Sequence, residues 1–101
     1  MISPSKRGVC VEYKAACLFI EAGFEVFLNA SPDGPVDLVV WDGANTYLID
    51  CKTLTKYLRK DGSVSYNAEK NKHPHVHYLG CHPDCWLWLS QNVPQPLQEV
   101  I

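Results

Sequence analysis

The sequence predicts a single α/β domain over residues 1–101, in which an N-terminal helix is followed by a series of short strands. Three observations support this: apolar residues at helical spacing over residues 5–22, strand-length apolar or alternating segments after them, and turn formers between those segments. The chain has 101 residues, 47% hydrophobic and 20% charged, which suits one small globular domain. This order of elements is compatible with either an α/β or an α+β sandwich.

The helix predicted over residues 5–22 can be capped by Ser3 or Ser5 and ends at Gly23. Five apolar residues recur along it at helical spacing, which predicts that they form its buried face: Val9, Tyr13, Ala16, Cys17 and Ile20. At about 100° per residue, Glu12 falls at the edge of this stripe. Its carboxylate is therefore expected at the boundary between helix and sheet.

Residues 24–28 alternate as a strand does, and the turn-rich segment 29–35 follows them. Two apolar strands, 36–41 and 46–52, are then expected to form a hairpin around the loop 42–45. These strands form the centre of the predicted sheet.

Asp61 and Gly62 mark a turn between two further extended arms. Residues 67–72 can form one helical turn, which Pro74 ends. Two more strands are expected at 77–81 and 85–89.

Residues 92–101 contain two prolines and are expected to form an irregular arm. The core of a 101-residue chain has little room for three tryptophans, and the strand segment CWLWL at 85–89 contains two of them. We therefore expect CWLWL and the C-terminal arm to be the surfaces of self-association.

Composition and charge narrow the class of protein. There is no apolar run of membrane-spanning length and no signal-peptide stretch, so we expect a cytoplasmic protein, or a phage protein acting in the host cytoplasm. Residues 15–51 carry six acids and no Lys or Arg, whereas residues 52–77 carry six bases and two acids. This division suits an anionic ligand beside a cation site, or simply solvated charge on a hairpin. The five cysteines are expected to be buried thiols rather than a disulfide frame.

The hairpin carries an unusual set of charges for two apolar strands. With a four-residue loop, facing residues have numbers that sum to 87, so Asp37 lies opposite Asp50 with Cβ atoms roughly 5 Å apart. A two-residue turn makes the two acids diagonal neighbours on the same face. Lys52 shares that face in both registers. Two carboxylates and one ammonium therefore converge.

Two carboxylates at this separation favour a divalent cation between them. Mg²⁺ binds one or two protein carboxylates, keeps several waters and takes its remaining ligands from substrate phosphate. The ion lowers the pKa of a water and stabilises charge on a phosphoryl oxygen. Lys52 can orient or deprotonate that water, or neutralise charge on the phosphate. We therefore expect a Mg²⁺ site, with Mn²⁺ as a substitute ion.

At these residues the chain resembles the PD-(D/E)XK nuclease superfamily. Val36-Asp37 stands where the family has Pro-Asp, and Asp50-Cys51-Lys52 matches (D/E)-X-K thirteen residues after Asp37. The resemblance covers residues 6–53, about half the chain. It implies a restriction-endonuclease-like core, a mixed sheet of four to five strands with an N-terminal helix that carries an acidic residue. The long helix that the family has after the (D/E)-X-K strand is hard to find in the following residues.

One branch of the superfamily, the archaeal-type Holliday junction resolvases, shows a further similarity. The helix segment Arg7-Gly8-x-x-x-Glu12, followed by Gly23-Phe24, resembles the helix of that branch whose glutamate completes the metal site. The resemblance implies a Mg²⁺-dependent endodeoxyribonuclease that acts on branched or duplex DNA and works as a homodimer.

The resemblance also implies roles for individual residues. Catalysis is assigned to Glu12, Asp37, Asp50 and Lys52, and metal binding to the three acids with the backbone carbonyl of Cys51. Basic side chains are expected to contact DNA phosphates with little regard to base sequence: Lys6, Arg7, Lys56, Arg59, Lys60, Lys70 and Lys72.

Other interpretations of these residues stay open. The chain could be a site-specific homing or restriction-like endonuclease, or a catalytically inactive DNA-binding module of the same fold. It could also be a small zinc-binding domain, because six residues offer zinc-type ligands at an unfamiliar spacing: His73, His75, His77, Cys81, His82 and Cys85. In a strand the first three histidines would share one face. The competing interpretation is a phosphate-facing histidine loop with two core-packed cysteines.

Overall fold

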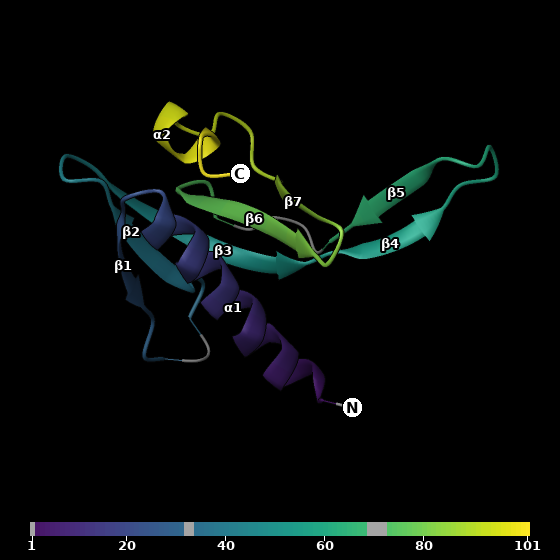
Figure 1. The fold of residues 1–101 in the computed structure, drawn as a ribbon, viewed down its shortest axis with the longest axis horizontal. Coiled ribbons are helices and arrows are strands. Elements are labelled where there is room, and N and C mark those ends of the chain that lie inside the picture. The colour runs from purple at the N-terminus through teal and green to yellow at the C-terminus, as the bar shows by residue number, and fades with distance from the viewer. Residues whose placement is uncertain (1, 32–33, 69–72) are drawn as a thin grey trace.

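The N-terminal helix α1 (Pro4–Glu21) packs on one face of a five-stranded mixed sheet, and a two-stranded arm projects from one end of that sheet (Figure 1). The computed structural model describes residues 2–31, 34–68 and 73–101. Within these ranges the architecture is mixed α/β with an N-terminal helix, as the sequence predicts. Neither described helix combines the length and apolarity needed to cross a membrane.

Seven strands and one short helix follow α1 in the part of the chain that the structure describes: β1 (Glu25–Leu28), β2 (Leu38–Trp41), β3 (Thr46–Thr53), β4 (Thr55–Leu58), β5 (Val64–Asn67), β6 (Val76–His82), β7 (Cys85–Trp88) and α2 (Gln95–Gln98). The main sheet has the order β1-β2-β3-β6-β7. β3 and β6 run parallel, and the other neighbouring pairs are antiparallel. β4 and β5 form the separate arm.

The ends of α1 lie close to the predicted positions. The Ser3 side chain accepts a hydrogen bond of 3.3 Å from the backbone N–H of Lys6, which confirms it as the N-cap. Gly23 follows the helix with φ of +97°, a conformation that residues with a Cβ rarely adopt. Its N–H donates to the carbonyl of Ile20, so the glycine ends the helix as expected.

The buried face of α1 is not the one that the apolar spacing predicts. Ala15 and Phe19 are fully buried and Ala16 nearly so. Four of the five residues expected in the core are exposed instead: Val9, Tyr13, Cys17 and Ile20. The small side chains of Ala15 and Ala16 let the helix approach the sheet closely, and the resulting dense packing is favourable. The predicted apolar stripe is left on the outer side.

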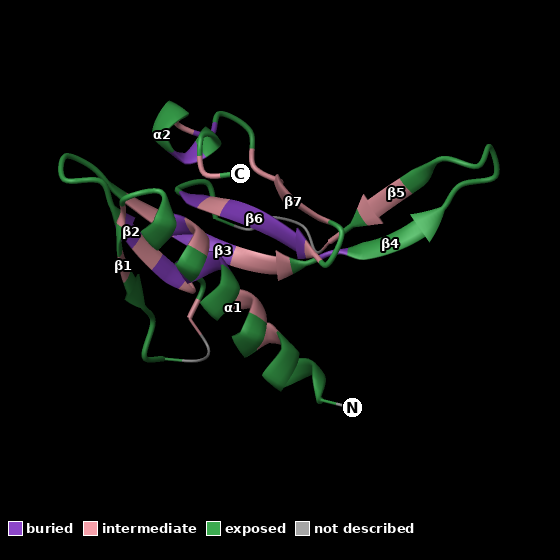
Figure 2. Ribbon diagram, in the orientation of Figure 1, coloured by how far each residue is buried: buried purple, intermediate pink, exposed green. Residues whose placement is uncertain are grey.

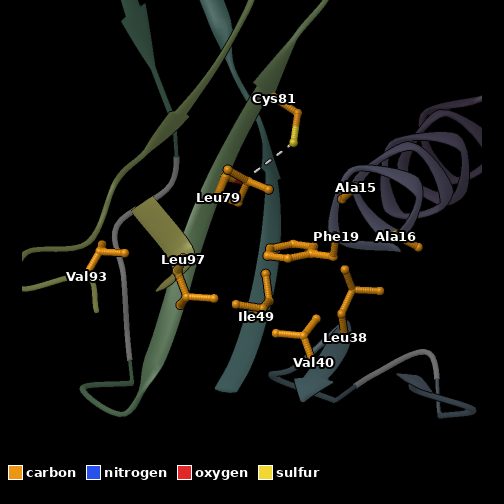
Figure 3. Close-up of a cluster of buried hydrophobic side chains, with 10 residues drawn as sticks. All are labelled: Ala15, Ala16, Phe19, Leu38, Val40, Ile49, Leu79, Cys81, Val93 and Leu97. Atoms are coloured by element: carbon orange, nitrogen blue, oxygen red, sulfur yellow. Dashed lines mark hydrogen bonds between the residues drawn. The ribbon is translucent and has the colours of Figure 1, made fainter. Parts of the chain in front are cut away.

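The main core lies between α1, α2 and the sheet face that carries Leu38, Val40, Ile49 and Leu79 (Figure 3). Residues 92–101 contribute to it, which contradicts the expectation of an irregular arm. Leu97 of α2 is fully buried, because an apolar residue on a single helical turn gains more from burial than the two prolines cost.

Both tryptophans of β7 also turn toward this core. Trp86 and Trp88 are half-buried and pack against it, and the indole N–H of Trp88 donates to the carbonyl of Leu97 at 3.2 Å. Much of the surface predicted for self-association is therefore used inside the monomer.

The β2–β3 hairpin has the first of the two registers considered, the one with a four-residue loop. Trp41 pairs with Thr46 and Leu38 with Ile49, so facing numbers sum to 87. The four-residue loop is stabilised by the side chain of Asp42, whose Oδ1 accepts the N–H groups of two following residues at 2.8 and 2.7 Å. The regular pairing ends at Leu38 and Ile49, because the backbone N–H of Asp37 also donates to the Ile49 carbonyl at 2.9 Å.

The β4–β5 arm stands in the place where the family pattern has a long helix. Its turn contains Gly62 with φ of +89°, as the predicted turn requires. All of β4 is exposed, and the arm extends away from the sheet (Figure 2). Asn67, at the start of the predicted helical turn, ends β5, and residues 69–72 lie outside the described ranges.

Candidate active site

The acidic and basic residues of the hairpin meet beside the end of β3. Asp37 directly precedes β2, whereas Asp50 and Lys52 lie on β3 and point to the sheet face opposite the main core. Glu12 approaches Asp37 from α1: burial is the main cause of the raised pKa of Asp37, and the charge of Glu12 adds to it. The helix α1 and the β2–β3 hairpin thus supply the four residues predicted to be catalytic.

Asp37 forms three hydrogen bonds with backbone groups of other residues. Its backbone N–H donates to the Ile49 carbonyl at 2.9 Å, and its own carbonyl accepts the Asn29 N–H at 3.0 Å. Its Oδ2 accepts the backbone N–H of Cys51 at 2.7 Å. The N–H and C=O of a strand residue point the same way, so the Cys51 carbonyl, predicted as a metal ligand, also faces the Asp37 side of β3.

Asp50 is a buried carboxylate that forms an ion pair with Lys52. The residue is 8% exposed, and its Oδ2 lies 3.0 Å from the Lys52 ammonium. Burial, followed by a hydrogen bond with Asp37, raises the pKa of Asp50 to about 6, although Lys52 opposes the rise. Burial also raises the pKa of Asp37, against the hydrogen bonds from Asp50 and Cys51.

Tyr78 completes the surroundings of this pair and was not singled out from the sequence. It lies opposite Asp50 across the parallel β3–β6 pairing and is 2% exposed. The Lys52 ammonium is 5.7 Å from the centre of its ring, and its hydroxyl accepts the His73 N–H at 3.0 Å. Parallel pairing between distant strands leaves no local sequence signal, so only the tertiary structure identifies this residue.

Gly80 lies opposite Lys52 in the same pairing. A Cβ at this position would meet the Leu54 side chain at 2.7 Å. Because Gly80 has no side chain, the Leu54 side chain can occupy this space beside β3.

The donor chemistry of this site suits Mg²⁺ bound through two carboxylates. Asp37 and Asp50 offer hard oxygen ligands, and burial raises the pKa of both, so a further positive charge would favour their ionised forms. Among residues 2–31, 34–68 and 73–101 no three His, Cys, Asp or Glu side chains are already arranged as a metal cage. Asp37 and Asp50 could hold an ion that takes its remaining ligands from water, and the metal roles of Glu12, Asp37, Asp50 and the Cys51 carbonyl all stay predictions.

The histidine and cysteine residues considered for zinc do not form one cluster. β6 begins at Val76, so His73 and His75 precede it, and the predicted shared face of three histidines is wrong. His77 and Cys81 lie on the core side, with Cys81 buried. The remaining pair, His82 and Cys85, face each other across β6 and β7 on the opposite side.

The predicted DNA contacts differ in how freely they can bind phosphate. The Lys56 ammonium is 2.7 Å from a carboxylate oxygen of Asp84, and Arg59 donates to the hydroxyl of Ser65 at 3.2 Å. Lys60 is exposed near the turn of the arm. Lys70 and Lys72 lie outside the described residues.

Arg7 lies in a second basic region at the N-terminal part of α1. Together with Lys14 and His82 it lines a cleft of about 400 Å³ between α1 and the β6–β7 turn. Lys6, in the same turn as Arg7, is exposed. The predicted DNA contacts that the structure describes therefore lie in two regions, one at the start of α1 and one on the arm.

No family model, no curated protein and no solved structure matches this chain.

Proposed function

We propose that this domain is a Mg²⁺-dependent DNA endonuclease with a restriction-endonuclease-like core of the PD-(D/E)XK type. The observation that supports it most is the convergence of Asp37 and Asp50 on neighbouring strands, with Lys52 3.0 Å from Asp50 and Glu12 acting on Asp37. The β2–β3 register is one of the two that the sequence allows, the one with a four-residue loop.

A purely structural role explains this arrangement poorly. Two acids that share a buried site repel each other, and a single lysine offsets only part of that cost. Apolar side chains at these strand positions would pack without any desolvation penalty. Raised carboxyl pKa values beside a specific cation are typical of functional sites.

Each side chain has a role that its position suits. Asp50 and Asp37 would hold the cation, and the Cys51 N–H keeps the Asp37 carboxylate oriented. When bound, Mg²⁺ lowers the pKa of a water and stabilises negative charge on the phosphate. Lys52 supports the attacking water or neutralises the phosphate, and the Tyr78 ring beneath it restricts its position.

Branched DNA is the substrate that we propose, as for the Holliday junction resolvases that the motif resembles. The described basic side chains lie on α1 and the β4–β5 arm rather than on one reading helix. Such contacts bind phosphates and respond to the shape of DNA more than to its base sequence. A homodimer would supply the second cut that a junction requires.

The test is a cleavage assay on a four-way junction, a linear duplex and a single strand at equal concentrations. The wild-type chain should place paired, symmetric nicks near the branch in Mg²⁺ or Mn²⁺ and none in EDTA. Asp50→Asn and Lys52→Ala should each lower the rate by at least about a hundredfold. Asp42→Asn, an acid in the exposed β2–β3 loop, is the matched control and should cut normally.

Other outcomes discriminate among the interpretations. Cutting of linear duplex at one sequence would replace the junction substrate with a site-specific endonuclease. Binding of DNA with no cleavage in either ion would favour an inactive DNA-binding module. Full activity of Asp50→Asn, or activity in EDTA, would contradict the proposal.

A further inference from the structure

The outer face of α1 carries a stripe of apolar side chains that are exposed to solvent in the monomer. It comprises Val9 (49% exposed), Tyr13 (56%), Cys17 and Ile20 (58%), which lie on one side of the helix. Ile2, 47% exposed, lies before the N-cap and lines the cleft beside Arg7 rather than this stripe. Monomeric proteins rarely expose a continuous apolar patch, and such patches mark interaction sites.

A shallow apolar hollow of about 390 Å³ borders this stripe. It lies between α1 and Trp86 of β7, and Tyr13, Cys17 and Leu18 line it from the helix. A ridge beside a hollow on the same surface suits a partner that presents the same ridge, because side chains of one helix pack into the grooves of another.

We propose that this face joins two copies of the chain through an antiparallel α1–α1 contact. In a two-fold helix pair centred on Tyr13, Val9 of each chain faces Cys17 of the partner subunit. Lys6 then lies beside Ile20 and Glu21 of the partner subunit. A two-fold interface uses the same patch on both copies, as one self-complementary stripe requires.

The charges of α1 favour this partner and this orientation. Its first turns carry Lys6 and Arg7, whereas Glu21 lies at its last residue, and Lys6 and Glu21 are both exposed. Antiparallel packing places each Lys6 next to the partner's Glu21, which gives two ion pairs at the rim of the apolar contact. Parallel packing would bring like charges together, and like charges across an interface are strongly unfavourable.

The same geometry has a consequence for the active sites, which depends on the proposed nuclease function. Glu12 lies on one flank of the stripe, and the hollow beside Trp86 lies on the other. A two-fold axis through the helix pair keeps both copies of Glu12 on the same side of the dimer. Both sites would therefore open toward one DNA molecule.

The oligomeric state tests the interface without reference to catalysis. In reducing buffer, light scattering across a concentration series should give a mass of about twice the 11.4 kDa of one chain. Tyr13→Glu places two like charges at the centre and should weaken dimerisation by at least about tenfold. Leu58→Glu, at a residue 73% exposed on the arm, is the matched control and should leave the mass unchanged.

A charge exchange tests the orientation. Lys6→Glu and Glu21→Lys should each weaken the dimer, and the double variant should restore it, with circular dichroism confirming that every variant is folded. A monomer at all concentrations would overturn the proposal, and so would a dimer that Tyr13→Glu leaves intact. If the double variant dimerises no more tightly than the single variants, the antiparallel arrangement is wrong. Junction cleavage can fail while the dimer persists, so the two proposals are separable.

Discussion

The carboxylate of Asp37 serves as a strand partner for Cys51: its Oδ2 accepts the Cys51 N–H at 2.7 Å, one residue before β2 begins. The side chain thereby replaces a backbone carbonyl at the point where the two strands stop pairing. One oxygen is committed to this bond, and the carboxylate as a whole is oriented toward Asp50. A residue proposed to bind metal therefore also completes the hydrogen bonding of β3.

Replacing Asp37 in two ways should separate these roles. Asp37→Ala leaves the half-buried Cys51 N–H without its acceptor and should lower the free energy of unfolding by about 1–2 kcal/mol relative to Asp37→Asn. The Asn carbonyl oxygen can still accept the bond. Urea unfolding at neutral pH measures the difference, and both variants should lose cleavage. Equal stability of the two variants would show that the bond contributes nothing.

Asp50→Asn should stabilise the protein at neutral pH while abolishing cleavage. The folded-state pKa of Asp50, about 6, lies above its ordinary 3.8, so the folded state binds the proton more tightly than the unfolded state. The resulting stability is present below about pH 4 and is lost as the pH rises through 6. Removing the buried charge should therefore raise the unfolding free energy at pH 7 by about 1–3 kcal/mol.

Unfolding free energies at pH 5 and pH 7.5 test this assignment. The wild-type chain should lose stability between these values, and Asp50→Asn should show a flatter profile. Asp42→Asn is the control of opposite sign, since N–H groups of Asn45 and Ala44 lower the pKa of Asp42. The stability that ionised Asp42 contributes to the folded state is present above about pH 4 and is lost as the pH falls below that value. An unchanged profile in Asp50→Asn would contradict the prediction.

Mg²⁺ should stabilise the wild-type fold without any DNA present. An ion at a hundred times its dissociation constant adds about 2.7 kcal/mol to the unfolding free energy, because only the folded state brings Asp37 and Asp50 together. Thermal unfolding at pH 7.5 with and without Mg²⁺ measures the effect. The shift should vanish in Asp50→Asn and persist in Asp42→Asn. Equal shifts in both variants would place the ion elsewhere.

The basic residues of the arm should contribute unequally to DNA binding. Lys60→Ala should reduce the slope of log affinity against log salt by about 0.9, the value for one duplex phosphate contact. Lys56→Ala should have a smaller effect, because Asp84 holds that ammonium at 2.7 Å. Asp84→Asn should tighten binding by releasing Lys56. Fluorescence anisotropy with inactive Asp50→Asn as the background measures all three.

The sequence determined the local parts of this structure and the composition of its site. The loop and the apolar strands limited the β2–β3 hairpin to two registers, of which the structure has the one with a four-residue loop. Both registers placed Asp37 and Asp50 close together, and a hydrogen bond between their side chains contributes to the pKa of each. Ser3 and Gly23 act within one helical turn, so the ends of α1 were also predictable. These features depend on residues within a few positions of each other or on a single tight loop.

The tertiary structure alone decided which face of α1 is buried. Both sides of the helix carry apolar residues at helical spacing, and packing density on the sheet selects Ala15, Ala16 and Phe19 over the larger stripe that contains Tyr13. It likewise decided the burial of Leu97 and the position of Tyr78 opposite Asp50. The parallel β3–β6 pairing joins residues that are 28 apart in sequence, and no local pattern encodes such a contact.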